Sequence, residues 1–146
     1  MPRSKVAILR TRPETVRADY HELMNLAGYQ DVIAKDADTG LKINISWHFF
    51  YPGSSTTPWQ LDGVVRALRR DGYDRARIHA CHNRTVVIDA RLGERENKQF
   101  NVVEAHGLRN VHLYEPGEEW INVRDAVSAP LLTALRQAGR VDGLVR

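Results

Sequence analysis

The sequence predicts an α/β fold, a Rossmann-like three-layer sandwich built on a mainly parallel sheet. Short apolar runs alternate along the chain with segments of helical periodicity, as they do in βαβ units. Several helical segments begin near a Thr or Pro and end at a Gly, which are typical start and stop signals. The run from Leu41 to Asp71 also joins a strand pattern, a small-residue loop and a helix start without interruption.

The first strand and helix are predicted near the N-terminus. Residues 5–10 (KVAILR) have the composition of a strand, and Pro13 is expected to open a helix. Gly28 is placed to end that helix. The apolar stripe of the helix, at i, i+4, i+7 and i+8, consists of Val16, Tyr20, Leu23 and Met24. Residues 31–34 (DVIA) fit either a short strand or an extended link.

The central strand and the second helix give the clearest local signals. Residues 41–46 (LKINIS) alternate apolar and polar side chains, as a strand does. Thr57 is predicted to be an N-cap, with Pro58 at the first helical position and Gln60 three residues after the cap. The helix is expected to end at Asp71-Gly72 and to bury one apolar face, formed by Leu61, Val64, Val65 and Leu68.

Further strands and a helix are predicted between residues 76 and 115. Residues 76–82 (ARIHACH) and 110–115 (NVHLYE) are expected to be strands. Residues 84–90 (RTVVIDA) fit a strand or an extended segment packed on the core. The polar stretch GERENKQ is expected to lead into a helix that carries Phe100 and Val103 and ends at His106-Gly107.

The C-terminal region completes the predicted domain organisation. Residues 120–123 (WINV) can pair across the EPGEE turn and add an antiparallel edge hairpin, and Pro130 is expected to open a last helix. We expect one α/β domain over residues 1–125 and a helical tail over residues 126–146. A chain of 146 residues is long enough for one domain with its own core.

Composition excludes several classes of protein. Cys81 is the only cysteine, so there is no internal disulfide, four-thiolate cluster or zinc ribbon, and a cytoplasmic location is expected. The sequence has neither the apolar run of a membrane span nor the pattern of a signal peptide. The net charge is +3, but the arginines are dispersed and only Arg69 and Arg70 are adjacent, so nucleic-acid binding is not expected.

The order of these motifs resembles the N-terminal part of domain-of-unknown-function family 362. The resemblance is carried by KIN (residues 42–44), TTP (residues 56–58), a helix closing in Asp-Gly, and then IHAC followed by HNRTVV. It covers about residues 5–124. It implies a redox or iron–sulfur setting, since some members are fused to ferredoxin-type cluster domains. This chain is shorter than a typical member, lacks the downstream half that holds cluster cysteines in some members, and departs from the family after about residue 126.

A ligand site is predicted where the central strand meets the second helix. Ligands of open α/β sheets bind beyond the carboxyl ends of the strands, and helix N-termini attract anions. We therefore expect an anionic small molecule to bind there, although the same residues also fit a solvated sheet face and a helix cap. The candidate ligand-binding residues are Lys42, Asn44, Ser54, Ser55, Thr56, Thr57, His82 and Asn83.

The sequence assigns no catalytic residue and no cofactor, so whether the protein is an enzyme stays open. There is no GxxxxGK[ST] or GxGxxG nucleotide motif. His79, Cys81 and His82 are close in sequence, but alternation along a strand separates His82 from the other two, so no metal site is expected. The charge run that contains Glu94, Arg95 and Glu96 is interpreted as a solvated helix start.

An aromatic cluster accompanies the predicted loop. Its members are Trp47, Phe49, Phe50, Tyr51 and Trp59. Three interpretations stay open: the wall of a pocket, a plug that holds the loop on the core, and a docking surface. In the last case the chain would be a non-catalytic interaction half-domain that pairs with itself or with a missing partner, for which the family resemblance implies an iron–sulfur protein.

Overall fold

The computed structural model describes residues 5–113 and contains one open sheet in this range. Its strands are β1 (Thr39–Lys42), β2 (Ile78–Asn83) and β3 (Arg109–Leu113), in the order β1-β2-β3. Both strand pairs are parallel, with Leu41 opposite Ala80 and His82 opposite His112. This confirms the prediction of an α/β fold with a parallel sheet.

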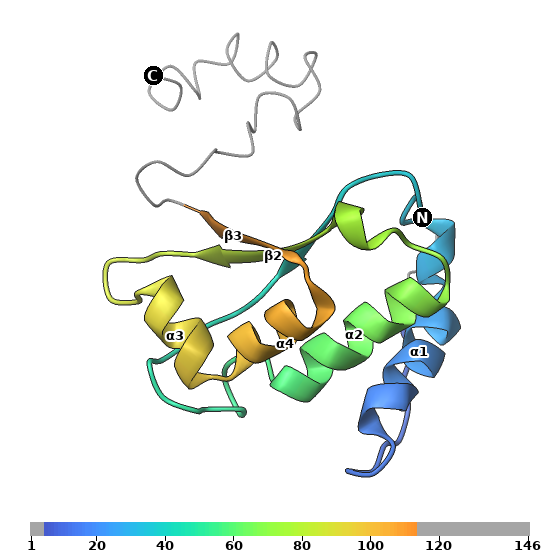
Figure 1. The fold of residues 1–146 in the computed structure, drawn as a ribbon. Helices are drawn as coiled ribbons and strands as arrows, with labels where there is room; N and C mark the ends of the chain where they lie inside the picture. The colour runs from blue at the N-terminus through green and yellow to red at the C-terminus, as the bar shows by residue number, and fades with distance from the viewer. Residues whose placement is uncertain (1–4, 114–146) are drawn as a thin grey trace, which may run out of the picture. The chain divides into compact units, whose positions relative to one another are not determined.

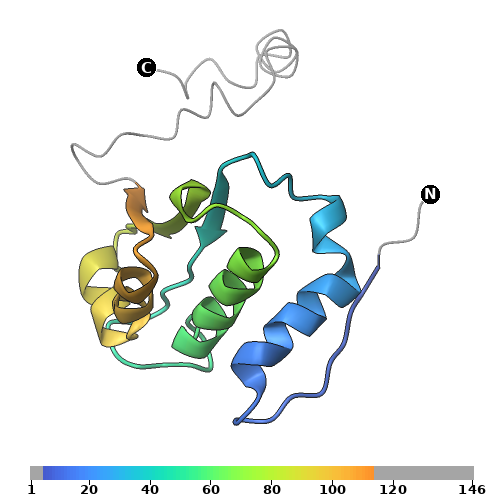
Figure 2. The same cartoon turned by 45° about the vertical axis from the view of Figure 1, so that its right-hand side comes forward.

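The helices of the described residues lie on one side of this sheet. They are α1 (Val16–Ala27), α2 (Pro58–Arg70), α3 (Ala90–Glu96) and α4 (Gln99–His106), with two 3₁₀ turns, η1 (Tyr29–Asp31) and η2 (Arg75–Arg77). α2, α3 and α4 lie along one sheet face, and α1 lies beside α2 (Figures 1 and 2). Residues 5–113 therefore form two layers, and the third layer of the predicted sandwich is not among them.

The main core lies between the sheet and the helices. Ile78 and Ala80 of β2 are fully buried, and Val103 of α4 packs into the same cluster. α2 contributes its buried face to this cluster through Leu61, Val65 and Leu68. Burying one such aliphatic side chain stabilises a fold by roughly 1.5–3 kcal/mol, so the apolar face of α2 is a main source of stability.

Most helix ends lie where local signals predicted them, but α1 begins at Val16 and not at Pro13, since residues 13–15 form a turn. The Thr57 hydroxyl accepts a hydrogen bond from the Gln60 N–H at 3.2 Å, and Pro58 occupies the first helical position of α2. Gly28 and Gly107 end α1 and α4 with φ angles of 79° and 59°. These left-handed conformations suit glycine because it has no Cβ.

The strand predicted for residues 5–10 is wrong, and so is the strand alternative for residues 84–90. Residues 5–10 form no strand, and Val6 and Ile8 are 80% and 85% exposed. Residues 84–89 form a loop in which the Thr85 N–H donates to the Ile88 carbonyl. An apolar β-branched run becomes a strand only where another strand accepts its hydrogen bonds. In residues 84–90 only the Arg84 N–H bonds to a strand, at the Leu113 carbonyl of β3, and the ladder does not continue beyond it.

Other boundaries also differ from the prediction. β1 begins and ends earlier than expected, because beyond Ile43 the Asn44 N–H donates to the Thr56 hydroxyl instead of continuing the ladder. The polar stretch before Phe100 is itself helical, as α3, with the Asp89 carboxylate capping the Leu92 N–H. Lys98, at φ 63°, separates α3 from α4.

The remaining predictions fall outside the residues that the structure describes. They are the WINV edge hairpin, the helix from Pro130, the domain limit at residue 125 and the tail over residues 126–146.

α1 and α2 approach each other closely at a glycine. A Cβ added to Gly63 would lie 2.5 Å from Tyr20 Cδ2 and 3.0 Å from the Arg17 carbonyl oxygen. A Cβ atom is not found 2.5 Å from another heavy atom, and the Arg17 carbonyl belongs to the backbone and cannot rotate away. The absence of a side chain at Gly63 therefore allows α1 to pack against α2.

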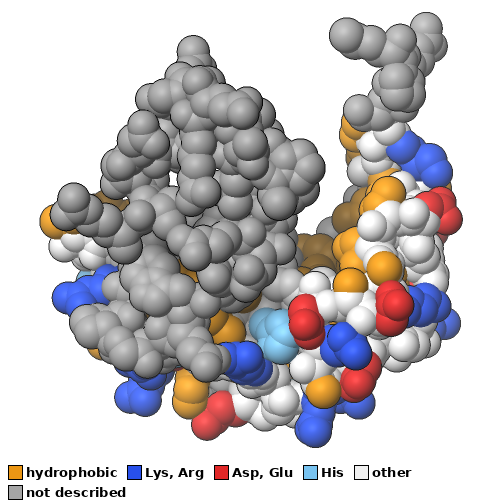
Figure 3. Space-filling view, turned by 90° about the horizontal axis from the view of Figure 1, so that it is seen from above, with side chains coloured by type: hydrophobic (Ala, Val, Ile, Leu, Met, Phe, Trp, Pro, Cys, Tyr) orange, Lys and Arg blue, Asp and Glu red, His pale blue; other side chains and the backbone are white. Residues whose placement is uncertain are grey.

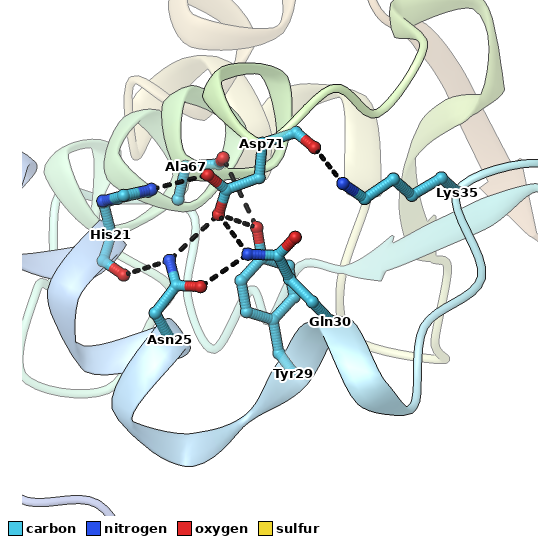
Figure 4. A network of polar contacts seen from close by, with 7 residues as sticks. All are labelled: His21, Asn25, Tyr29, Gln30, Lys35, Ala67 and Asp71. Carbon is cyan, nitrogen blue, oxygen red and sulfur yellow. Dashed lines mark hydrogen bonds and ion pairs between the residues drawn. The ribbon is translucent and has the colours of Figure 1, made fainter.

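The partly buried carboxylate of Asp71 holds the other end of this helix pair together (Figure 4). Asp71, the C-cap of α2, accepts hydrogen bonds from Tyr29 at 2.6 Å, Asn25 at 2.9 Å and Gln30 at 3.1 Å. His21 Nε2 lies 2.7 Å from its other oxygen. These contacts, that with Tyr29 foremost, hold the pKa of Asp71 well below its usual range. Burial, followed by the Asp71 contact, raises the pKa of Tyr29.

We predict that Asp71→Asn lowers the free energy of unfolding by about 2 kcal/mol, because hydrogen bonds to a charged acceptor contribute roughly 1.5–3 kcal/mol each and an amide replaces only some of them. Urea unfolding at neutral pH measures the change. Asp36→Asn is the matched control, since Asp36 is exposed. Equal stabilities of the two variants would contradict the anchoring role of Asp71.

Candidate functional site

The Ser/Thr loop, residues 54–57, is hydrogen-bonded to the segment that directly follows β1. The Asn44 N–H donates to Thr56 Oγ1 at 2.9 Å, and the Thr56 N–H donates to the Asn44 carbonyl at 2.9 Å. The Ser46 N–H donates to Ser55 Oγ at 3.1 Å. The loop thus continues the sheet edge through side-chain acceptors, which places the residues before α2 directly beside the carboxyl end of β1.

The hydroxyls of this loop already act as acceptors. Ser55, Thr56 and Thr57 each receive one backbone N–H, from Ser46, Asn44 and Gln60 respectively. A hydroxyl that accepts a hydrogen bond still has its own proton to donate. Ser55, Thr56 and Thr57 therefore shape the loop first, and only their protons are left for a ligand.

A small polar cluster lies at the exposed side of the loop. Asn44 Nδ2 donates to the Ser54 carbonyl at 2.8 Å and to Ser46 Oγ at 3.0 Å. Ser54 Oγ lies 2.9 Å from Ser46 Oγ. Within residues 5–113 the carboxamide oxygen of Asn44 has no hydrogen-bond partner. Asn44 and Ser54, both predicted site residues, are thus brought together with Ser46, which the sequence analysis did not single out.

Lys42 and Asn83 belong to the sheet face opposite the helices. Lys42 is paired in register with Cys81, and Asn83 lies two residues further along β2, so alternation puts all three side chains on the same face. Lys42 is exposed, and its ammonium group donates to the Ile43 carbonyl at 3.1 Å. The structure therefore brings four predicted residues together at the carboxyl edge of the sheet, which is the side on which β1 and β2 end. They are Lys42, Asn44, Ser54 and Asn83.

His82 is turned away from this edge. It is fully buried on the helix-facing side of β2, where its Nε2 lies 3.0 Å from Glu94 Oε2. His112 of β3 stacks on its ring and places Nε2 3.2 Å from the other Glu94 oxygen. Asn110 Nδ2 donates to Glu94 at 3.0 Å. His82 thus belongs to a buried polar cluster with Glu94, His112 and Asn110.

His79 and Cys81, which are close to His82 in sequence, lie on the sheet face opposite the helices. His79 contacts Asp38 at 3.1 Å, and Cys81 is buried, which raises the pKa of its thiol. In the part of the chain that the structure describes, no group of three or more His, Cys, Asp or Glu side chains is arranged to hold a metal ion.

The sequence analysis missed the role of Glu94. Its interpretation as part of a solvated charge run is wrong, because Glu94 is 2% exposed. A different signal was present in the spacing of α3: the buried positions repeat at i, i+3, i+4 and i+7 as Ala90, Gly93, Glu94 and Asn97. Gly93 on this face lets α3 lie close to the segment that follows β1. A Cβ on Gly93 would lie 2.5 Å from Ile45 Cγ2.

Glu94 keeps its charge in this position. Burial by itself raises the pKa of the carboxyl, but the contacts with His112, His82 and Asn110 outweigh it and hold the pKa well below the ordinary value. A buried carboxylate is stable only when such donors surround it.

The aromatic residues before α2 form a ladder of exposed rings. Trp47 and Phe49 stack with ring centroids 6.1 Å apart, and Phe49 and Tyr51 with centroids 5.7 Å apart. Trp47 and Phe49 are 54% and 55% exposed. The buried Asn97 side chain fixes the backbone beneath them by donating to the Trp47 carbonyl at 2.8 Å and accepting the Tyr51 N–H at 3.2 Å. The loop is therefore held in place while its rings face outward.

Charge on the visible surface is mixed. Seen from above, basic and acidic side chains are interspersed on the part that is not grey (Figure 3). This arrangement agrees with the dispersed arginines of the sequence.

Comparison of the chain with models of known protein families, with curated proteins and with solved structures gave no match. The resemblance to domain-of-unknown-function family 362 thus stays a prediction. Among the described residues, no helix has the length and apolar character needed to cross a membrane.

We predict that Glu94→Gln lowers the free energy of unfolding by about 3 kcal/mol at neutral pH, because it removes one partner of a buried charged cluster. A lowered folded-state pKa adds stability that is present above the ordinary value of 4.5 and is lost as the pH falls below it. The difference from wild type should therefore shrink under acid, as urea unfolding at several pH values measures.

Glu96→Gln, on the exposed side of the same helix, is the control and should match wild type. A difference between wild type and Glu94→Gln that stays constant down to acidic pH would show that the charge of Glu94 contributes nothing.

Proposed function

We propose that this protein is a Rossmann-like α/β domain that binds an anionic small molecule at the carboxyl edge of its sheet. The supporting observation is the position of Lys42. Its ammonium group is exposed just beyond β1, and among residues 5–113 it has no carboxylate within ion-pair distance. A cation held there by a backbone carbonyl is available to an anion that enters at this edge.

Neighbouring groups supply hydrogen-bond donors for the same ligand. The Asn83 carboxamide lies at this edge, and Asn44 orders the loop before α2, where the Ser54 hydroxyl donates to Ser46 Oγ. α2 begins beside them and presents its positive dipole end. The backbone N–H of Trp59 lies in the first turn of α2, so no carbonyl of a preceding helical turn is there to accept it. Lys42 would neutralise the ligand's charge, and these groups would orient it.

We predict that a ligand-induced rise in melting temperature is lost in Lys42→Ala. Thermal shifts measured with small carboxylates at fixed ionic strength test this, because a ligand at about 100 times its Kd adds roughly 2.7 kcal/mol to folded-state stability. Arg69→Ala is the control: it removes an exposed cation from the far end of α2. An unchanged shift in Lys42→Ala would refute the proposal.

A second candidate function rests on the aromatic ladder. Exposed contiguous apolar surface on a soluble domain marks an interaction site, and stacked aromatic rings are frequent anchors of protein interfaces. Because Asn97 fixes the backbone, little conformational entropy would be lost when a partner covers the rings. In this proposal the chain is a non-catalytic half-domain that pairs through Trp47, Phe49 and Tyr51 with a second copy.

We predict concentration-dependent association of the wild-type chain in sedimentation velocity, and a monomer for the double variant Trp47→Ser, Phe49→Ser. Both residues are exposed, so the variant should keep the wild-type circular dichroism spectrum. A wild-type chain that sediments as a monomer at all concentrations argues against self-association.

A further inference from the structure

A groove lined by arginines lies between α1 and α2, away from the carboxyl edge of the sheet. Its volume is about 330 Å³. Three residues of α1 and Glu14, which precedes α1, line one side, and three residues of α2 line the other. The lining residues are Glu14, Arg17, Ala18, His21, Arg66, Ala67 and Arg70.

The floor and the rim of the groove differ in chemistry. Ala18 and Ala67 have the smallest side chains of the lining and leave space between the two helices. Arg17, Arg66 and Arg70 surround that space with three guanidinium groups from two helices. The alanines therefore create the depth, and the arginines create a concave site of positive charge.

Two of these arginines are pre-positioned by one carboxylate. Asp62 accepts hydrogen bonds from Arg17 Nη1 at 3.2 Å and from Arg66 Nε at 2.9 Å, and His106 Nε2 lies 2.7 Å from it. The pKa of Asp62 is lowered: burial opposes this, but the contacts with His106 and Arg66 prevail. Each guanidinium is held through one nitrogen, so its other N–H groups are left for a ligand.

Arg70 has no such partner. Across residues 5–113 it makes no hydrogen bond or ion pair, and it lies one turn after Arg66 on the same face of α2. The three arginines carry +3, and Glu14 and Asp62 together carry −2, so these five groups have a net charge of +1, while His21 is paired with Asp71. Positive charge thus remains after the internal ion pairs are formed.

We infer that this groove binds the phosphate group of a small molecule. Guanidinium groups pair with phosphate oxygens through two parallel N–H bonds, a geometry that suits phosphate better than a lone ammonium does. A volume of about 330 Å³ accepts a phosphate with a small organic group attached. This site shares no residue with the Lys42 edge, so it stands or falls independently of the proposed function.

The test uses isothermal titration calorimetry of the whole 146-residue chain at fixed ionic strength. The probes are inorganic phosphate and glycerol phosphate, which separate recognition of the free ion from recognition of a monoester. We expect Arg70→Ala to weaken binding of the better probe about tenfold or more. Arg69→Ala should bind as wild type does, since Arg69 does not line the groove.

Amide shifts in a two-dimensional NMR titration give a second readout. Movement of the Ala18 and Ala67 signals during phosphate addition would locate the ligand in the groove and support the inference. Three outcomes would overturn it: no binding of either probe by wild type, equal weakening in Arg69→Ala, or weakening in Lys42→Ala alone. The last would assign the phosphate to the carboxyl edge.

Discussion

The Asp71 carboxylate is the constraint on which the helical layer depends. It ends α2 and receives hydrogen bonds from α1 and η1, so three separate elements meet at one charge. A carboxylate in this position is costly to leave unpaired, because burial removes water from it. Its contacts with Tyr29, Asn25 and His21 therefore fix the separation and the rotation of α1 relative to α2.

Gly63 acts on the same helix pair from the other end. The close approach of Tyr20 and of the Arg17 backbone at Gly63 sets how near the helices come, while Asp71 sets their alignment. Between these two points the facing alanines leave the groove open. The shape of the arginine-lined groove is thus a result of helix packing, and no loop is needed to form it.

The sequence predicted helices better than strands for a physical reason. Thr57, Gly28 and Gly107 act on their own helix ends through contacts within a few residues, so their effect is visible in the local sequence. A strand depends on a partner that is distant in sequence. Residues 5–10 and 84–90 have strand-like composition but no ladder to join in the described region, and composition alone does not reveal that.

The candidate site was also predicted only in part, where local sequence order decides it. Its place at the end of β1 followed from the order of strand, loop and helix, and Lys42, Asn44, Ser54 and Asn83 do lie there. The sequence did not show that the hydroxyls of Ser55 and Thr56 are used by backbone amides. Nor did it show that His82 points at Glu94, since a charged residue in a polar run looks exposed until the packing is known.

The parallel sheet has a consequence for how the chain folds. Gly40 pairs with His79 and His79 pairs with Arg109, so every strand pairing in the described residues joins segments 30 or more positions apart. Closing such loops costs entropy before any ladder contact repays it, and proteins with distant pairings fold slowly. The helix caps are local contacts, whereas β2 pairs with β1 across the segment that contains α2, and β3 pairs with β2 across the segment that contains α3 and α4. A newly made chain therefore has no sheet until β2 has emerged, and its central strand is completed last, when β3 arrives.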